Sequence, residues 1–404
     1  MDMYKQWADL GQADEAISQA DALAILHGER DGEPIELLPL LEAAGAVRRR
    51  YFGNTVTAHI LDNVQNGACP EDCNYCGQSK ISDSPIKPYK IKPVDEIVAE
   101  AKQAKEAGAW RFCMALSGRG PDDRDIEHMG EAIRRISDMG LRTCLSAGLM
   151  DDAKAKSLKS AGLDRLNHNL NTSEKHYPSI CTTHTYEDRM NTLRAAREAG
   201  LGTCSGLIAG MGEGYEDLVS VAFELRKLGS ESIPVNFLLP IEGNPLLDSA
   251  CEGQALNPQL VLRILCMVRL VNPTAEVRVG AGREHHLRSM QSFALWPANS
   301  LFVDGYLLTE GSEAAATFQM IRDAGYELAV EGGQAPQAMD AAAAATAGAA
   351  ATKAQGCCGS GHGNGGGGAG SSRPTVNDGL PRLKSTVTDG KRFVPAGEVR
   401  LPQR

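Results

Sequence analysis

Apolar and polar residues follow two alternating patterns along most of the chain. Short apolar runs, typical of buried parallel strands, alternate with longer segments in which apolar residues recur every three or four positions, as in amphipathic helices. Several of the helical segments end in glycine, which commonly terminates a helix. The pattern predicts eight strands, near residues 55–63, 111–117, 142–148, 165–171, 202–210, 232–240, 275–282 and 299–305.

Eight strands that alternate with helices over about 270 residues predict an α/β fold, a TIM-type (β/α)8 barrel. An open doubly wound sheet is the alternative, but no GxGxxG motif follows the first strand to favour it. Residues 1–50 have helical spacing, so we expect an N-terminal helical extension before a barrel domain at 51–330. Residues 331–404 contain an Ala-rich and then a Gly-rich stretch, which predicts a disordered C-terminal tail.

The net charge and the length of the apolar runs argue against two classes of protein, nucleic-acid-binding and membrane-spanning. The net charge of -10 argues against a nucleic-acid partner, which needs a basic face. No run reaches the roughly 18 to 20 apolar residues that cross a membrane, and the first 15 residues lack a signal-peptide run. We therefore expect a cytoplasmic protein without a membrane partner. Structural disulfides are rare in a reducing cytosol, so the 11 cysteines indicate metal, cluster or catalytic roles.

The clearest chemical signal is the segment GACPEDCNYCGQS, directly after the first predicted strand. It places Cys69, Cys73 and Cys76 in a C-x3-C-x2-C pattern within a short loop. Three thiolates at this spacing can hold three irons of a 4Fe–4S cube and leave the fourth iron open for a small chelating ligand. A structural zinc site is the alternative, but it normally needs four ligands in paired C-x2-C units, and no second pair is present.

A second group of cysteines lies in three different predicted strands. Cys113, Cys144 and Cys204 would all point into the barrel in one register, because strand side chains alternate between faces. Each of them alone is more often a small packing residue. Arg278 occupies another strand, and an inward guanidinium should face an anion or a metal centre. The alternative is an outward arginine paired with a helix carboxylate.

The C-x3-C-x2-C motif resembles that of the radical S-adenosylmethionine superfamily. From about residue 35 to 330 the chain is similar to the biotin synthase family, through GACPEDCNYCGQS, RFCMA, GLDRLNHNLNTS, TTHTYEDRMNTLRAAREAG, SIPVNFLLPIEGNPL, VRVGAGRE and ANSLFVDGYLLT. Lipoyl synthase would carry another dense cysteine motif near the N-terminus, and residues 1–68 contain no cysteine. Related enzymes that isomerise or cleave small molecules would lack the strand cysteines and the buried arginine.

This resemblance implies a reaction and its cofactors. A 4Fe–4S cluster on Cys69, Cys73 and Cys76 would bind S-adenosylmethionine, and a 2Fe–2S cluster would be held by Cys113, Cys144, Cys204 and Arg278. Radical hydrogen abstraction at C9 and C6 of dethiobiotin would precede sulfur insertion from the second cluster. The family also implies an electron donor such as flavodoxin or ferredoxin, iron–sulfur assembly proteins and a homodimer. A non-catalytic iron–sulfur carrier is the rival hypothesis, and it would leave S-adenosylmethionine intact.

The resemblance also assigns binding residues. For S-adenosylmethionine they are Tyr75, Asn171, Arg189, and Gly206 and Gly210 of the segment GLIAGMGE, although such glycines often mark only a tight turn. For dethiobiotin they are Asn169 and Asn236, whose amides carry both the donor and the acceptor that a ureido ring needs. Asn167 shares a strand face with Asn169. Asn171 stands where some family members carry Asp, and it can still hydrogen-bond a ribose hydroxyl.

The remaining polar and sulfur-containing residues are interpreted as structural. We expect His168 to face outward from its strand, His285 and His286 to begin an exposed helix, and Arg283 and Glu284 to support the structure. Three further cysteines are expected to be packing or surface thiols: Cys181, Cys251 and Cys266. In the tail, Cys357, Cys358 and His362 could bind a metal or feed iron and sulfur to the barrel, although incidental thiols are the simpler interpretation.

Overall fold

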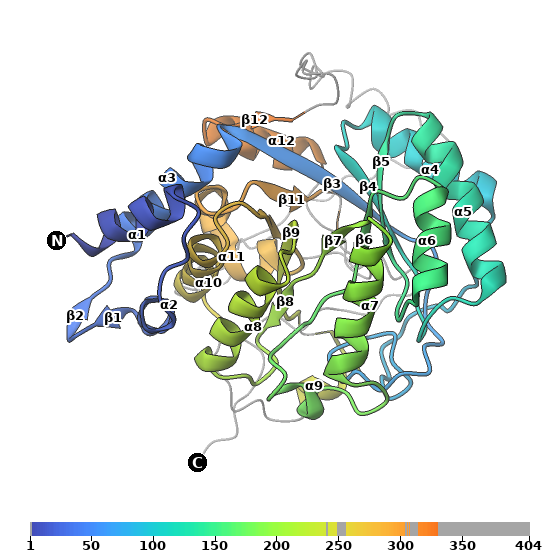
Figure 1. Cartoon of the computed structure of the whole chain (residues 1–404), viewed down its shortest axis with the longest axis horizontal. Coiled ribbons are helices and arrows are strands. Elements are labelled where there is room, and N and C mark those ends of the chain that lie inside the picture. The colour runs from blue at the N-terminus through green and yellow to red at the C-terminus, as the bar shows by residue number, and fades with distance from the viewer. Residues whose placement is uncertain are drawn as a thin grey trace, which may run out of the picture. The chain divides into compact units, whose positions relative to one another are not determined.

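The computed structural model describes residues 2–239, 241–248, 256–303, 305, 307 and 314–329. Its centre is a closed barrel of parallel strands, in which β9 pairs with β10 and β11 pairs with β3 (Figure 1). The barrel confirms the predicted (β/α)8 fold. Its strands are β3 (Thr55–Asn63), β4 (Arg111–Ala115), β5 (Arg142–Ser146), β6 (Arg165–Asn167), β7 (Gly202–Cys204) followed by β8 (Leu207–Ala209), β9 (Ser232–Phe237), β10 (Glu276–Val279) and β11 (Ser300–Phe302).

Helices connect the strands and cover the outside of the barrel (Figure 1). They begin where the sequence supplies caps: Asp122 and Thr185 each accept a hydrogen bond from the third helical N–H and form a capping box. The longer ones are α4 (Val94–Glu106), α5 (Asp123–Asp138), α6 (Asp152–Ser160), α7 (Tyr186–Glu198), α8 (Tyr215–Lys227) and α10 (Pro258–Val271). Shorter turns are η1 (Tyr177–Ser179), α9 (Pro245–Asp248), α11 (Arg283–Leu287) and η2 (Arg288–Leu295). After the barrel, α12 (Ala314–Asp323) leads to β12 (Glu327–Leu328), which pairs with the start of β3.

The N-terminal extension is helical, as predicted, but a small hairpin interrupts it. Its elements are α1 (Met3–Gln12), α2 (Gln19–His27), the antiparallel pair β1 (Glu29–Arg30) and β2 (Glu33–Pro34), and α3 (Leu37–Phe52). Gly28 ends α2 in the left-handed conformation, with φ of 83°. The hairpin was missed because two-residue strands carry no usable periodicity.

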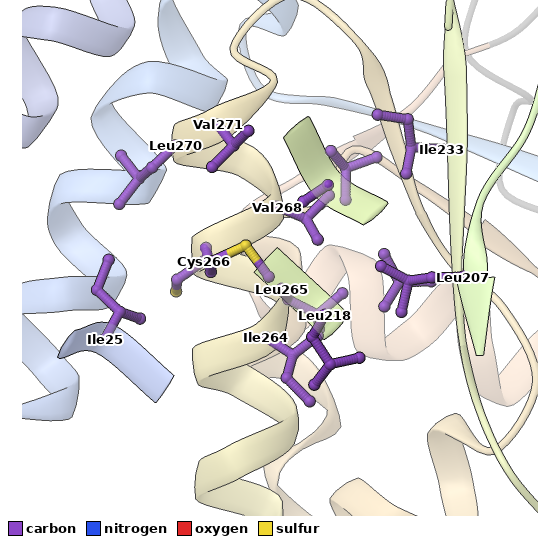
Figure 2. Packing of buried hydrophobic residues seen from close by; sticks show 14 of the residues in the cluster. Ile25, Leu207, Leu218, Ile233, Ile264, Leu265, Cys266, Val268, Leu270 and Val271 are labelled. Atoms are coloured by element: carbon purple, nitrogen blue, oxygen red, sulfur yellow. The ribbon is translucent and has the colours of Figure 1, made fainter. Parts of the chain in front are cut away.

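Helix α10 joins this extension to the barrel through apolar packing. Figure 2 shows Ile25 of α2 on one side of α10, and Leu207 and Ile233 of the barrel strands on the other. Cys266 of α10 is fully buried in this cluster, as expected for a packing thiol. Helix α10 is apolar on nearly every face because α2 covers one side of it and the barrel strands cover the other.

One predicted strand, 202–210, is broken into β7 and β8. At the break, Gly206 passes so close to β9 that a Cβ atom would lie 1.8 Å from the carbonyl oxygen of Pro234. Backbone approach of this kind excludes every residue but glycine. Gly206 therefore has a packing reason to be glycine, independent of any ligand.

Replacing Gly206 by alanine is expected to destabilise the barrel by about 3 kcal/mol or more, because backbone must move to admit the methyl group. This corresponds to a fall in melting temperature of about 5 °C or more, measured by circular dichroism. Gly130→Ala is the matched control, since its Cβ would lie 3.6 Å from Ala161 Cβ, an ordinary contact, inside helix α5. Equal melting temperatures for the two variants would contradict the prediction.

Some sequence interpretations fall outside the described residues. These include Cys251, the tail residues Cys357, Cys358 and His362, and the expected disorder of residues 331–404. Among the helices that the structure describes, none combines the length and the apolar character needed to cross a membrane.

Candidate active site

The C-x3-C-x2-C motif lies in the loop that follows β3, at the carboxyl ends of the barrel strands. An antiparallel bridge between Asn66 and Tyr89 closes the base of this loop. Within the loop, the Cys69 N–H donates to the Gln78 carbonyl at 3.3 Å and the Cys76 N–H donates to the Cys73 carbonyl at 3.2 Å. All three thiols are free, and Cys73 is buried. Barrel enzymes carry their active sites at this end of the strands.

Cys181, interpreted as an ordinary thiol, instead contacts the motif. Its Sγ lies 3.6 Å from Cys73 Sγ, and it comes from the turn between η1 and α7. Cys73 donates a hydrogen bond to Cys181, which lowers the pKa of Cys181 to about 4 and raises that of Cys73. The burial of Cys181 agrees with its interpretation as a packing thiol, but its contact with the motif was missed, because 108 residues separate the two cysteines and no local pattern connects them.

Cys73, Cys181 and His184 offer ligand atoms within 4.8 Å of one another, but both ring nitrogens of His184 already form hydrogen bonds. Arg189 can only donate, so His184 Nε2 must accept from it at 2.9 Å. Nδ1 then carries the proton and donates to Glu71 at 2.5 Å. Neither nitrogen has a free lone pair, so in this arrangement the three residues do not form a metal site.

Three residues predicted to bind S-adenosylmethionine lie in contact with one another. Asn171 donates through Nδ2 to the Tyr75 hydroxyl at 2.6 Å, and Arg189 reaches the same hydroxyl at 3.4 Å. Arg189 also donates to the carbonyl of Asn169 at 2.8 Å. Its charge is buried beside Tyr177, a position that suits an anionic ligand group. The motif loop, the residues after β6 and helix α7 thus converge on one place.

The two asparagines predicted to bind the second substrate are held by backbone groups. Asn169 Oδ1 accepts from the Gly206 N–H at 3.0 Å. Asn236 Oδ1 accepts from the Ala281 N–H at 3.0 Å, and its Nδ2 donates to the Leu207 carbonyl at 3.2 Å. Both amides are therefore oriented. Asn169 Oδ1 also accepts from Asn167 Nδ2 at 3.3 Å, whereas Asn236 Oδ1 can still accept a second hydrogen bond.

Gly210 lies at the end of β8, where the chain turns toward α8. It has φ of +99°, a conformation that favours glycine. The Gly210 and Met211 N–H groups both donate to the Glu213 carboxylate at 2.7 Å. These contacts explain the turn, so a role of Gly206 or Gly210 in binding a cofactor remains a prediction.

Inside the barrel, Cys113, Cys144 and Cys204 form a separate buried cluster with Leu61 and Phe302 around it. Cys113 and Cys144 are direct neighbours in the β4–β5 pairing. A cavity of about 50 Å³ adjoins Cys113 and Cys144 and is also lined by Ser146, Asn167 and Arg278. The three strand cysteines therefore face inward together, as the alternation of strand side chains predicted.

Arg278 faces the same interior and is not paired with a helix carboxylate on the outside. It donates to Cys204 Sγ at 3.6 Å, to Ser232 at 2.9 Å and to Ser300 at 3.1 Å, and it forms an ion pair with Glu276. Burial would lower the pKa of Arg278, but Glu276 and the nearby cysteines raise it. The guanidinium therefore stays charged beside the thiols.

Glu276 lies at the centre of a buried charged layer formed by Arg165, Glu276 and Arg278, and sequence reasoning missed it. Its carboxylate accepts from Arg165 at 2.7 Å and from Ser232 at 3.1 Å, besides Arg278. Burial would raise the pKa of Glu276, but the surrounding cations hold it well below its usual range. A buried acid in a strand was a usable signal, because such a group needs partners.

His59 of β3 was also missed. It is fully buried, its Nδ1 lies 3.7 Å from Cys113 Sγ, and its Nε2 lies 3.3 Å from Glu276. Burial lowers the pKa of His59 well below its ordinary value, and Arg278 lowers it further, so the imidazole is neutral.

His168 was interpreted as a structural residue, and His285 and His286 as the start of an exposed helix. His168 is buried, and burial lowers its pKa. His285 and His286 do lie in a short helix, α11, but the expected exposure of His286 is wrong. Its Nε2 donates to the Leu238 carbonyl at 2.8 Å, and burial lowers its pKa to about 4. Arg283, in the same helix, forms an ion pair with Glu284 at 2.5 Å.

A second cavity, of about 640 Å³, opens at the amino ends of the strands, on the far side of the charged layer. Its lining includes Arg142, Arg165, Trp110 and Glu276. The buried cysteine cluster and its charged layer thus lie between this cavity and the end of the barrel that carries the motif loop.

Comparison with known proteins agrees with this geometry. The Radical SAM superfamily profile matches residues 65–225, and the Biotin and Thiamin Synthesis associated domain matches residues 234–327. Biotin synthase of Acaryochloris marina is 56% identical over 320 residues, which cover 79% of this chain and 90% of that protein. Biotin synthase of Leptospira biflexa is 54% identical, over 76% of this chain and 85% of that protein.

Among solved structures, methylornithine synthase matches with a TM-score of 0.69 and 21% identity, covering 80% of this chain and 97% of that chain. At this identity the match supports the fold alone. The identity to the two biotin synthases, over most of their length, is far higher. The chain belongs to the biotin synthase family of the radical S-adenosylmethionine superfamily.

Proposed function

We propose that this protein converts dethiobiotin to biotin by radical insertion of sulfur. The observation that carries the proposal is the presence of two separate cysteine groups in one barrel, one in the loop after β3 and one buried between the strands. When bound, a 4Fe–4S cluster with S-adenosylmethionine supplies the radical that removes hydrogen at C9 and C6, and an inner 2Fe–2S cluster supplies the sulfur.

The outer residues fit a cluster with one open iron. Cys69, Cys73 and Cys76 would supply three thiolates, and the remaining iron would have no cysteine of the motif to bind it. Beside them, Tyr75, Asn171 and Arg189 present a phenol, an amide and a buried cation. We assign them to the adenosyl, ribose and carboxylate groups of S-adenosylmethionine, with Gly206 and Gly210 as backbone contacts.

The inner residues fit a second cluster. Cys113, Cys144 and Cys204 are buried and unpaired, and Arg278 brings a positive charge to Cys204. A positive charge next to the sulfur atoms offsets the negative charge of three thiolates, which would otherwise be costly to bury. We assign these four residues to the 2Fe–2S site, with Asn169 and Asn236 orienting the ureido ring of dethiobiotin between the two groups.

The chain itself contributes positioning and the exclusion of water. The barrel wall is closed, so a substrate held between the two cysteine groups is shielded from solvent. Arg189 is fixed by the Asn169 carbonyl and Tyr177, which holds its charge in one place for a ligand carboxylate. The radical chemistry belongs to the cofactors.

Further partners follow from the reaction and from the family. The outer cluster must receive electrons, so we propose a low-potential donor such as flavodoxin or ferredoxin. A cluster that gives up sulfur must be rebuilt, so we propose that iron–sulfur assembly proteins act on this chain. We also propose a homodimer in the cytoplasm.

The test is anaerobic reconstitution with iron and sulfide, followed by incubation with S-adenosylmethionine, a reductant and dethiobiotin. Mass spectrometry should detect biotin and about two molecules of 5′-deoxyadenosine per biotin, because two C–H bonds must be broken. Formation of deoxyadenosine without a sulfur-containing product would support the radical chemistry and contradict the assignment of dethiobiotin as the substrate. If neither product formed, the protein would be an iron–sulfur carrier, the rival hypothesis.

A further inference from the structure

His184 lies immediately before helix α7, between the loop of the cysteine motif and Arg189. It belongs neither to that motif nor to the residues predicted to bind S-adenosylmethionine. Its side chain is buried. The next residue, Thr185, caps α7 through a capping box, which fixes the start of the helix beside His184.

The imidazole of His184 joins a guanidinium to a carboxylate. Arg189 Nη2 donates to His184 Nε2 at 2.9 Å, because a guanidinium ion has no lone pair with which to accept. The proton of the neutral ring is therefore on Nδ1, which donates to the Glu71 carboxylate at 2.5 Å. Cys181 Sγ, at 3.3 Å from Nδ1, is a weaker second acceptor. His184 thus accepts from Arg189 and donates to Glu71 at the same time.

Glu71 is fixed at the other end of this chain of hydrogen bonds. It lies within the C-x3-C-x2-C loop, and it is buried. Its carboxylate also accepts from Thr183 Oγ1 at 2.7 Å and from Arg119 Nη1 at 3.2 Å. The loop that carries the motif cysteines is therefore linked through His184 to the buried cation beside it.

Arg189 is held on several sides but keeps one donor. Its Nε donates to the Tyr177 hydroxyl at 2.5 Å, and its Nη1 donates to the Asn169 carbonyl at 2.8 Å. The partners of Nη2 are His184 and, at the longer distance of 3.4 Å, the Tyr75 hydroxyl. Among the residues that the structure describes, the second hydrogen of Nη1 has no partner. One N–H group and the positive charge are thus available to a ligand.

This arrangement suits a guanidinium that binds a carboxylate. A long arginine side chain loses conformational freedom when it binds a ligand, and fixing it beforehand removes that cost. The acceptor that fixes Arg189 is neutral, so it does not cancel the positive charge. A carboxylate in the same place would pair with the guanidinium and compete with an anionic ligand for its N–H groups. His184 keeps the Glu71 carboxylate one imidazole ring away from Arg189.

We propose that Glu71 and His184 are positioning residues for S-adenosylmethionine, which hold Arg189 where it binds the carboxylate of that cofactor. The proposal rests on the proposed function, which assigns this carboxylate to Arg189. It adds a link by which the loop that bears the three motif cysteines also orients the carboxylate-binding cation.

The test measures the Kd of S-adenosylmethionine by equilibrium dialysis, with the full-length protein reconstituted anaerobically with iron and sulfide. His184→Asn keeps an amide N–H near Nδ1 for Glu71 but has no acceptor near Nε2. Its Kd should rise about 10-fold, as expected for the loss of one hydrogen bond to a charged group. His184→Gln places an amide oxygen near Nε2, so its Kd should stay within about threefold of that of the unsubstituted protein.

The matched control is His128→Leu, which removes a histidine of α5 that contacts the Lys92 carbonyl and should leave the Kd unchanged. Iron and sulfide are counted in every sample, so that each Kd refers to protein that carries the outer cluster.

A double variant tests whether His184 acts through Arg189. Arg189→Met should raise the Kd at least about 10-fold, because the buried cation is lost. His184→Asn should add nothing in the Arg189→Met background, since the group that His184 positions is gone. A merely structural role of His184 would instead give additive effects.

Three results would overturn the proposal: an unchanged Kd in His184→Asn, a Kd of His184→Gln as high as that of Arg189→Met, or additive effects in the double variant. The second result does not require the His184→Asn variant to fold. Each of them leaves the proposed function standing, provided that the unsubstituted protein forms 5′-deoxyadenosine and biotin. If the unsubstituted protein neither binds nor cleaves S-adenosylmethionine, the proposed function fails, and this proposal fails with it.

Discussion

Cys76→Ala is expected to abolish the cleavage of S-adenosylmethionine. Cys76 is one of three loop thiols, and alanine leaves two protein ligands for a cube that needs three. Formation of 5′-deoxyadenosine should fall at least about 1,000-fold, equivalent to about 4 kcal/mol in activation free energy. Biotin should fall with it, because the hydrogen abstractions depend on the same radical.

The measurement is deoxyadenosine by mass spectrometry after anaerobic reconstitution, with iron counted in the same samples. Cys266→Ala is the control, since Cys266 is an equally unpaired cysteine in the apolar core around α10. It should keep its iron and its turnover. Substantial cleavage by Cys76→Ala would remove this motif from the cofactor site.

Cys204→Ala should have a different effect, because Cys204 lies in the barrel interior and not in the loop. Iron at the inner site should be lost, and biotin formation should fall at least about 100-fold, about 2.7 kcal/mol. The outer loop is untouched, so deoxyadenosine should still form without sulfur insertion. Loss of biotin with retention of deoxyadenosine would show that the two cysteine groups have different roles.

The same assays and the Cys266→Ala control apply to this variant, and Cys113→Ala should behave in the same way. Absorption and iron content report on the inner cluster independently of turnover. If Cys204→Ala and Cys113→Ala both kept full iron and full biotin formation, the assignment of the strand cysteines to a cluster would be withdrawn.

Much of this protein could be predicted from local patterns. The eight strands and the helices between them follow from the spacing of apolar residues, which depends only on how side chains alternate along each element. The loop cysteines are a few positions apart, so their common role is visible in the sequence. The inward direction of Cys113, Cys144 and Cys204 follows from strand alternation once a barrel is assumed.

Other features depended on contacts between distant segments. Cys181 meets Cys73 across 108 residues. Glu276 contacts Arg165 of β6 and His59 of β3, besides Arg278 on its own strand. The break at Gly206 reflects its approach to Pro234 on β9.

Sequence by itself thus determined most of the elements, the fold class and the two sets of cysteines. Only the tertiary structure decided which groups surround each set. The physical reason is that periodicity is a property of one segment, whereas contact between strands depends on their register and on the closure of the barrel.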